Sequence, residues 1–373
     1  MKRIFFLGEL LIILLFSSCL NETEENAKFN LSIAKSTELL DFQKLVSSTN
    51  IIQLENNDSL FLSDIDDVLM QNEKIYILDK MQEAIMMYDS TGRYLKRYQE
   101  KGRAKNEYTN LDDWTFDENG IYLLDFNKVI ILDNELNYRR TIYLTKIVND
   151  NKFIGADRIE LYKGRLFVYD DNNKSVYSIA KDGSRFIRHI LTDQRKCSLN
   201  IGLNPNEKVF HPIGDALYVV PGRSDCIYKL YNEDVELFAT IDYENKEKNY
   251  AILNSTKGED YNSKVSHIPY SIHQIFTSGN NIYMFYPARG GSYIKINLKD
   301  STYHEYVGYK EGMVMKKDHP SWDAINGNMW YRLVEKNHEE MLETPSSIVN
   351  NISAGNIHKC DSEVLQYLVI YSL

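Results

Sequence analysis

The sequence predicts an all-β fold: a six-bladed β-propeller with four-stranded antiparallel blades, closed by pairing of an N-terminal strand with the C-terminal blade. Three observations predict it. Tyr is abundant at 27 of 373 residues and Pro is scarce at 7, a composition that favours strands. Apolar residues follow a period near two within short runs, which excludes helical repeats. The runs recur every 45 to 65 residues, a spacing typical of propeller blades.

The repeat is clearest between residues 73 and 102, where three β-rich runs are separated by short polar turns. The first of these runs has a counterpart further along the chain in each repeat, and we assign it as the second strand of a blade. The second strands are predicted at residues 75–79, 121–125, 166–170, 217–221, 282–286 and, as the poorest copy, 329–333.

The other strands follow at regular offsets, with polar turns between them. Third strands are predicted at residues 84–88, 129–132, 175–179, 226–230 and 292–296. Fourth strands are predicted at residues 94–98, 138–144, 186–191, 237–241 and 303–306. First strands are predicted at residues 114–116, 158–161 and 274–276. Residues 244–264 are a polar insertion in which we expect a helical turn, and residues 337–350 contain a predicted helix that stops at Pro345.

The two ends of the repeat region predict how the ring closes. Residues 364–371 are a strongly apolar strand, and residues 51–54 are a lone strand ahead of the first blade. A ring of blades must seal its seam, because unpaired sheet edges promote aggregation. We therefore expect residues 51–54 to form the outer strand of the last blade beside residues 364–371, within a propeller domain that spans residues 45–373.

The N-terminus has the pattern of a targeting segment. Lys2 and Arg3 precede an apolar stretch that is too short for a membrane span. The small residues before Cys19 resemble the lipobox of bacterial lipoproteins, so residues 1–18 are expected to be a signal peptide and Cys19 to be lipidated. Residues 19–44 would then form a lipidated tether, whose acidic start is similar to the surface-export signal of Bacteroidetes lipoproteins. The alternative is an ordinary signal peptide cut nearby.

Charge and cysteine usage narrow the range of partners. The formal net charge of −10 argues against nucleic acid, whose binding needs clustered Lys and Arg. Beyond Cys19, the three cysteines Cys197, Cys226 and Cys360 have no spacing typical of a zinc site. They are idle thiols, or two of them form a disulfide.

The chain from about residue 45 resembles the six-bladed β-propeller lipoproteins of Bacteroidetes, a family with NHL-like and TolB-like propeller architecture. The most specific match is to the motif Gly-Arg-Gly-Pro-Gly-Glu-Tyr after the first blade. Gly102, Arg103, Glu107 and Tyr108 agree with it, whereas residues 104–106 differ. The resemblance implies the fold and a location in the cell envelope, as an outer-membrane lipoprotein exposed at the surface. It implies no particular activity.

A set of polar residues is predicted at the mouth of the central channel. The positions nine residues before each second strand hold Asp66, Asp112, Asp157, Lys208 and His273, and the next positions hold Asp67, Asp113, Arg158, Val209 and Gln274. The functional interpretation is a site for a cation or a positively charged ligand, with calcium as the cofactor that such carboxylates suit. The structural interpretation is that each Asp accepts hydrogen bonds from nearby backbone amides.

Arg103, Glu107, Tyr108 and Trp114 are predicted near the same face, where aromatic rings beside Arg are common in binding surfaces. The alternative for Trp114 is packing between blades. His211 and His273 each lie near a first strand and, with carboxylates, suit a metal, although no fixed ligand spacing is present.

These patterns favour a lipid-anchored, non-catalytic binding module for a glycan, a peptide or a partner protein. The sequence contains no hydrolase nucleophile elbow, zinc-protease motif, P-loop or EF-hand. The alternative is a metal-dependent, calcium-type hydrolase or lyase that acts at the channel mouth. A structural component of a larger envelope complex is a third hypothesis.

Overall fold

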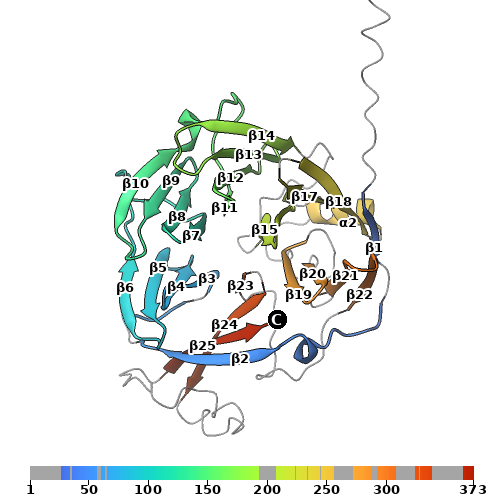
Figure 1. Cartoon of the computed structure of the whole chain (residues 1–373), viewed down its shortest axis with the longest axis horizontal. Coiled ribbons are helices and arrows are strands. Elements are labelled where there is room, and N and C mark those ends of the chain that lie inside the picture. Colours follow the sequence, from blue (N-terminus) through green and yellow to red (C-terminus); the bar gives the residue numbers. More distant parts are fainter. Residues whose placement is uncertain are drawn as a thin grey trace, which may run out of the picture.

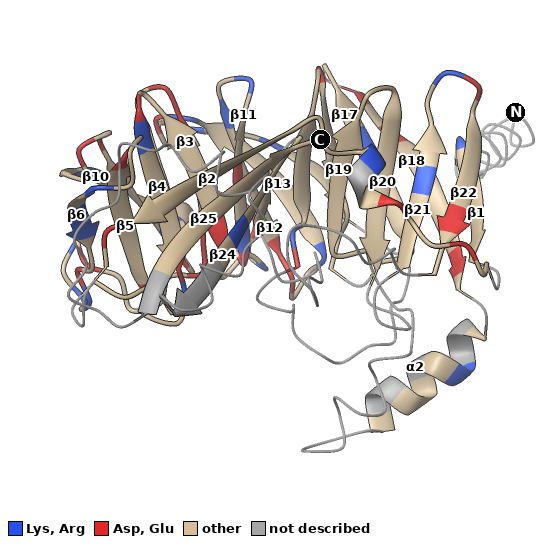
Figure 2. Ribbon diagram, turned by 90° about the horizontal axis from the view of Figure 1, so that it is seen from below, with Lys and Arg blue, Asp and Glu red and all other residues tan. Residues whose placement is uncertain are grey.

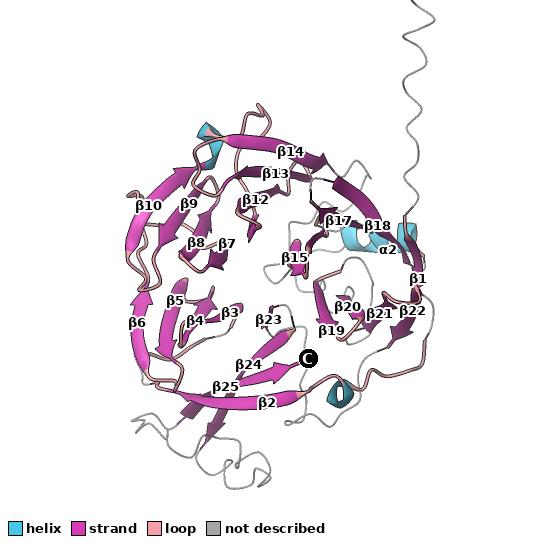
Figure 3. Ribbon diagram, in the orientation of Figure 1, coloured by secondary structure: helices cyan, strands magenta, loops and turns pink. Residues whose placement is uncertain are grey.

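Six small antiparallel sheets form a closed ring, as predicted (Figures 1 and 3). The computed structural model describes residues 27–33, 36–56, 60–63, 65–192, 207–222, 224–232, 234–243, 245–255, 272–286, 292–307, 324–326, 328–337 and 364–373. Each sheet is one blade, with its first strand nearest the ring axis and its last strand at the rim. The inner strands of adjacent blades contact one another, so they enclose a channel.

Blades one to three are continuous in sequence and each contains four strands. Blade one comprises β3 (Asp67–Gln71), β4 (Lys74–Asp79), β5 (Ala84–Asp89) and β6 (Tyr94–Tyr98). Blade two comprises β7 (Asp113–Asp117), β8 (Gly120–Asp125), β9 (Lys128–Leu132) and β10 (Tyr138–Tyr143), followed by the 3-10 helix η2 (Leu144–Lys146). Blade three comprises β11 (Arg158–Tyr162), β12 (Arg165–Asp170), β13 (Ser175–Ala180) and β14 (Phe186–Thr192).

Blades four to six include the insertions and both ends of the propeller. Blade four comprises β15 (Phe210–Ile213), β16 (Ala216–Val219), β17 (Cys226–Tyr231) and β18 (Asp234–Tyr243), with β1 (Phe29–Ile33) added outside β18. Blade five comprises β19 (Gln274–Ser278), β20 (Asn281–Tyr286), β21 (Ser292–Asn297) and β22 (Thr302–Tyr306). Blade six comprises β23 (Ala324–Asn326), β24 (Met329–Asn337), β25 (Val364–Ser372) and β2 (Ser48–Leu54).

Burial along a blade explains the sequence pattern. In blade one, β4 and β5 are buried at nearly every position, whereas the rim strand β6 alternates between exposed and half-buried residues. Middle strands are covered on both faces by the adjacent blades, so they consist of continuous apolar runs. Three aspartates that end the second strands, Asp79, Asp125 and Asp170, are buried and accept hydrogen bonds from nearby backbone amides.

The predicted closure of the ring is confirmed. β2 pairs antiparallel with β25, with Ile51 opposite Val369 and Leu54 opposite Gln366. Ile51 packs in the cluster between blades five and six, while Ile52 and Leu54 pack in the cluster between blades six and one. The N-terminal strand therefore seals the last blade and also contributes to the core on both of its sides.

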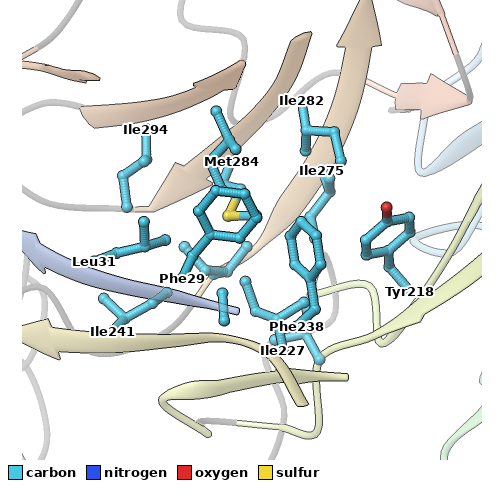
Figure 4. Packing of buried hydrophobic residues seen from close by; sticks show 14 of the residues in the cluster. Phe29, Leu31, Tyr218, Ile227, Phe238, Ile241, Ile275, Ile282, Met284 and Ile294 are labelled. Carbon is cyan, nitrogen blue, oxygen red and sulfur yellow. The ribbon is translucent and has the colours of Figure 1, made fainter. Parts of the chain in front are cut away.

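The expected tether over residues 19–44 is corrected from residue 29 onward. β1 pairs in parallel with β18, and alternate residues Phe29, Leu31 and Ile33 are buried among side chains of blades four and five (Figure 4). Leu40 and Phe42, the latter in the 3-10 helix η1 (Phe42–Lys44), are buried between blades five and six. These apolar side chains hold the segment on the propeller, so the folded body begins ahead of residue 45.

The insertion after blade four contains a helix, as expected. α2 (Lys246–Ser255) lies beyond the face of the ring onto which β18 leads (Figure 2). The helix expected near residue 340 falls outside the described residues, except that β24 continues to Asn337. Cys19, Cys197 and Cys360 also lie outside them, whereas Cys226 is a buried thiol. Within the described part of the chain, no helix is long and apolar enough to cross a membrane.

A close contact between blade one and β2 gives a first prediction. Gly92 has φ of +90°, and a Cβ there would lie 1.9 Å from the Gln53 backbone oxygen. Gly92→Ala is therefore expected to lower the free energy of unfolding by about 2–4 kcal/mol in urea titrations. Gly164 is the control, because its φ is +73° but nothing lies within 4 Å of its Cβ position. Equal losses in the two variants would show that the contact with β2 contributes nothing.

Candidate functional site

A cavity of about 250 Å³ lies where the inner strands meet. Its wall combines apolar residues with charged groups from four blades, because each inner strand directs alternate side chains toward the axis. The polar residues that line it are Asp67, Asp113, Thr115, Arg158, Glu160, Lys208 and His211.

Lys208 connects blade four to two other blades. Its Nζ donates hydrogen bonds to Asp67 Oδ2 of blade one at 3.1 Å and to the Ile325 backbone oxygen of blade six at 3.0 Å. Trp114 of blade two donates its Nε1–H to the same Asp67 oxygen at 3.1 Å. Both partners of the ion pair are largely shielded from solvent, so this pair holds its geometry better than an exposed one.

Asp113 and Arg158 form the next part of the wall. Asp113 Oδ2 accepts from the backbone N–H of Ile159 at 3.0 Å, which joins blade two to blade three. Arg158 donates to the backbone oxygens of Glu207 and Asp157 at 2.9 and 2.7 Å. Burial, with the Arg158 charge, lowers the pKa of nearby Lys80, against the opposing effect of the Asp113 carboxylate. Carboxylates and cations are thus interleaved around the cavity.

Glu160 is a half-buried acid whose pKa is raised. Thr115 Oγ1 donates to Glu160 Oε1 at 3.1 Å, and the same hydroxyl accepts from the backbone N–H of Leu161 at 3.0 Å. Burial, reinforced by the neighbouring Asp113 carboxylate, raises the pKa of Glu160 to about 8. Glu160 is therefore mostly protonated at pH 7, and the remaining charges on the wall balance as two carboxylates and two cations.

His211 is a neutral, fully engaged side chain. Its Nδ1 accepts from the backbone N–H of Ile275 at 3.3 Å, so the proton is on Nε2, which lies 3.1 Å from the Lys208 backbone oxygen. Burial, together with the Lys208 charge, lowers the pKa of His211 to about 3. With both ring nitrogens used by backbone groups, His211 does not fit the role of a metal ligand considered from the sequence.

The aspartates expected to line the channel mouth are directed to the backbone instead. Asp66, Asp112 and Asp157 each accept a hydrogen bond from the backbone N–H fourteen residues later, that of Lys80, Phe126 and Asp171, at 2.5, 2.8 and 2.8 Å. None of the three is among the residues that line the cavity. Their repeated role is to fasten the start of each first strand to the end of the second, as in the structural interpretation.

The other candidate residues are dispersed. His273 is buried, with its backbone paired to Phe285 and Lys208. Tyr108 is fully buried in the core between blades one and two, and Arg103 is exposed. Glu107 closes its own loop, because its carboxylate accepts from the backbone N–H of Ala104 at 2.9 Å. Only Trp114 both packs between blades and lines the cavity.

The described residues do not bring the acidic side chains proposed for calcium together as a metal site. The carboxylates of Asp66, Asp112 and Asp157 are each used by a backbone N–H, and a calcium ion needs six to eight converging oxygen ligands. Among the described residues, no group of three His, Cys, Asp or Glu side chains is placed to hold a metal ion. The channel wall instead offers alternating hydrogen-bond donors and acceptors.

Three of the residues that line the cavity lie one position after the aspartates that the sequence predicts at the channel mouth. Asp67, Asp113 and Arg158 immediately follow the three aspartates, whereas Lys208 occupies in blade four the same place as those aspartates, nine residues before the second strand. Neighbouring residues of a strand point to opposite sides, so the inward set could be separated from the outward set only once the first residue of each strand was known. Thr115 and Glu160 gave no sequence signal of their own, and His211 was singled out only as a metal ligand.

The raised pKa of Glu160 gives a second prediction. The folded state holds the proton up to about pH 8, whereas an unfolded glutamate releases it near pH 4.5. This contribution to stability is complete below pH 4.5 and is lost as the pH rises through 8. Glu160→Gln is expected to raise the free energy of unfolding by about 2 kcal/mol at pH 8.5 and to change it little at pH 5. Urea titrations at both pH values measure this, and Glu118→Gln, at an exposed glutamate, is the control. A gain in the free energy of unfolding of Glu160→Gln that does not depend on pH would contradict the prediction.

The comparisons with known proteins concern the family and the fold. A family model described as a domain of unknown function (DUF4934) matches residues 26–355. No curated protein matches the chain. The chain is similar in structure to a protein of Bacteroides fragilis NCTC 9343 described as exported, with a TM-score of 0.64, 10% identity and coverage of 91% of this chain and 98% of that one. It is also similar to a member of the DUF4221 family from Bacteroides vulgatus ATCC 8482, with a TM-score of 0.50, 12% identity and the same coverage. At these identities the likeness shows the fold alone.

Proposed function

We propose that this chain, which belongs to the DUF4934 family, is a lipid-anchored β-propeller of the cell envelope that binds a ligand at its channel without catalysing a reaction. The observation that carries the proposal is the cavity of about 250 Å³ with its fixed, balanced charges. Binding sites are typically concave, preformed and provided with a few well-placed polar groups.

The wall charges favour a small polar group as the bound part of the ligand. Asp67 and Asp113 face Arg158 and Lys208, and protonated Glu160 adds a neutral donor. A strongly charged ligand would gain attraction from one pair and repulsion from the other. The end of a peptide or of a neutral glycan matches this pattern, because each presents donors and acceptors together. A partner protein would meet the same groups through an inserted loop.

Export and anchoring rest on the sequence before residue 27. The lipobox-like residues before Cys19 and the acidic stretch after it favour an outer-membrane lipoprotein exposed at the surface. The relative in fold from Bacteroides fragilis is described as exported, which agrees with this location. Metabolic labelling with a palmitate analogue is expected to label the protein and not its Cys19→Ser variant. Equal labelling of both would contradict lipidation at this cysteine.

Two adjacent aspartates provide a matched test of ligand binding. Asp113→Asn alters the cavity wall, and its amide oxygen can still accept from Ile159 N–H. Asp112→Asn is the same change one residue away, at a carboxylate that accepts from Phe126 N–H and does not line the cavity. The probes are a panel of neutral oligosaccharides and short peptides. Their binding is detected by thermal melting of the protein and then measured by calorimetry.

The expected result is a saturable melting shift with at least one probe, whose affinity falls about tenfold or more in Asp113→Asn and little in Asp112→Asn. Equal losses in both variants, or no shift across the panel, would contradict the channel as the binding site. In a separate experiment, calcium chloride alone is added and thermal melting of the protein is measured. A calcium-dependent shift that Asp112→Asn with Asp157→Asn abolishes would favour the metal-dependent enzyme instead.

A further inference from the structure

A cavity of about 310 Å³ lies at the rim of blade five, away from the channel. Most of its wall comes from the last two strands of the blade, β21 and β22, and one residue comes from the N-terminal segment. The lining residues are Glu38, Lys295, Asn297, Thr302, Tyr303, His304 and Tyr306. None of them lines the channel cavity, so this rim cavity is a separate place for a ligand.

The strand register brings several polar side chains onto one face of blade five. Lys295 on β21 pairs with His304 on β22, and paired residues of antiparallel strands point to the same side. Tyr306 is two residues after His304 on the same strand, so it lies on this face as well. Tyr303 has the opposite orientation, and the cavity therefore extends around the outer edge of β22.

Glu38 joins the wall from a distant part of the sequence. His304 donates its Nε2–H to Glu38 Oε2 at 2.9 Å, although the two residues are 266 positions apart. The backbone oxygen of Glu38 also accepts from the N–H of Val307 at 2.8 Å. β1 and β2, which precede and follow Glu38, lie at the rims of blades four and six (Figure 1). The cavity is thus complete only when the N-terminal segment lies against blade five.

The aromatic side chains of the wall are held in place. The hydroxyl of Tyr303 accepts from the backbone N–H of Ser32 on β1 at 3.3 Å. The ring of His304, fixed by Glu38, meets the ring of Tyr306 nearly edge-on, with 4.7 Å between their centres. Side chains that are ordered before a ligand arrives lose less conformational entropy on binding, so these rings form a prepared surface.

Three polar groups of the wall are available to a ligand. Among the described residues, no hydrogen bond or ion pair uses the amine of Lys295, the Nδ1 atom of His304 or the hydroxyl of Tyr306. Burial, together with the Glu38 carboxylate, raises the pKa of Tyr306, so its hydroxyl keeps its proton. With a neutral imidazole, the charges of Lys295 and Glu38 balance. The wall therefore offers hydrogen bonds without an excess of either charge.

We propose that the rim cavity binds a neutral oligosaccharide. A sugar ring has an apolar face of C–H groups and an edge of hydroxyl groups, and tyrosine combines the same two properties in an apolar ring with a polar tip. Three of the seven lining residues are aromatic, and all seven have polar side-chain groups, so the wall provides no purely apolar pocket for a peptide side chain. Tyr303 is 42% exposed, which leaves a ring surface open for stacking.

Neutral tetrasaccharides of glucose, mannose, xylose and N-acetylglucosamine are the probes, titrated into the full chain by calorimetry. Saturable binding of at least one is expected, and His304→Ala is expected to weaken it about tenfold or more. Tyr306→Phe is the second variant, because it removes only the hydroxyl and keeps the packing of the ring, and it is expected to weaken binding severalfold. His189→Ala is the matched control. His189 is exposed on the rim strand of blade three, beside the ring of Tyr177, and does not line the cavity.

Chemical footprinting locates the bound saccharide without a variant. Diethyl pyrocarbonate modifies accessible histidines, and mass spectrometry is expected to show that the saccharide protects His304 and leaves His189 unprotected. No saturable binding across the four probes, or an equal loss in His304→Ala and His189→Ala, overturns the proposal. Protection of His304 by short peptides and by no saccharide overturns it as well.

The channel variant separates this proposal from the proposed function. Saccharide binding that is lost in His304→Ala and kept in Asp113→Asn supports the rim cavity, whatever the result at the channel. Saccharide binding that is lost in Asp113→Asn and kept in His304→Ala belongs to the channel and overturns the rim proposal.

Discussion

A chain that begins at residue 56 is expected not to fold into a closed ring, because it lacks β2. β2 buries Ile51, Ile52 and Leu54 in two core clusters and pairs along its full length with β25. Burial of three aliphatic side chains contributes roughly 5 kcal/mol or more, a large share of the 5–15 kcal/mol that stabilises a typical domain. The apolar strand β25 would also become an open sheet edge, which promotes aggregation.

The control is a chain that begins at residue 34, which lacks β1 but keeps β2. β1 adds to the rim of blade four and closes no seam, so this chain is expected to melt cooperatively at a lower temperature. The chain from residue 56 is expected to show no cooperative transition in circular dichroism and to elute as aggregate in gel filtration. A monomeric, cooperatively melting chain from residue 56 would show that the ring does not need its N-terminal strand.

Phe42→Ala is expected to be the most destabilising single substitution of those considered, at about 3–5 kcal/mol. Phe42 is 2% exposed, and its ring centre lies 5.2 Å from that of Tyr293 and 5.6 Å from that of Trp330. These two partners belong to blades five and six. Removing the ring leaves a cavity between the two blades that their rigid sheets cannot fill.

Leu39→Ala is the control for Phe42→Ala, since Leu39 lies three residues away and is 45% exposed. It is expected to change the free energy of unfolding by less than about 0.5 kcal/mol, measured by urea titration of both variants. A loss below about 1 kcal/mol for Phe42→Ala would mean that the segment before β2 is only loosely attached to the propeller.

The blade repeat and the closing pair of strands could be predicted from the sequence because their signals are local and repeated. Residues 75–79 and their counterparts have the same apolar runs, and each run is bounded by turn residues. The closing pair was predicted by exclusion, since residues 51–54 and 364–371 were the strands left over when the blades had been assigned. β10 to β14 follow their predicted ranges for the same reason.

The segment assigned as a tether shows where local signals were too weak. Phe29, Leu31 and Ile33 alternate with polar residues, which is a strand pattern, but only five residues long and followed by polar sequence. A parallel strand at a sheet rim depends on a partner far along the chain, here β18 more than two hundred residues later. Nothing near residue 29 indicates that partner.

The sequence by itself determined the all-β class, the six blades and the ends that close the ring, since period and apolar runs follow directly from burial on both faces of each sheet. Only the tertiary structure decided which polar residues reach the channel. Asp66 and Asp67 are neighbours, yet Asp66 accepts a hydrogen bond from the backbone N–H of Lys80, whereas Asp67 forms an ion pair across the channel with Lys208. A strand exposes successive residues to opposite sides, so a shift of one residue reverses their roles, and that register is set by pairing between strands rather than by composition.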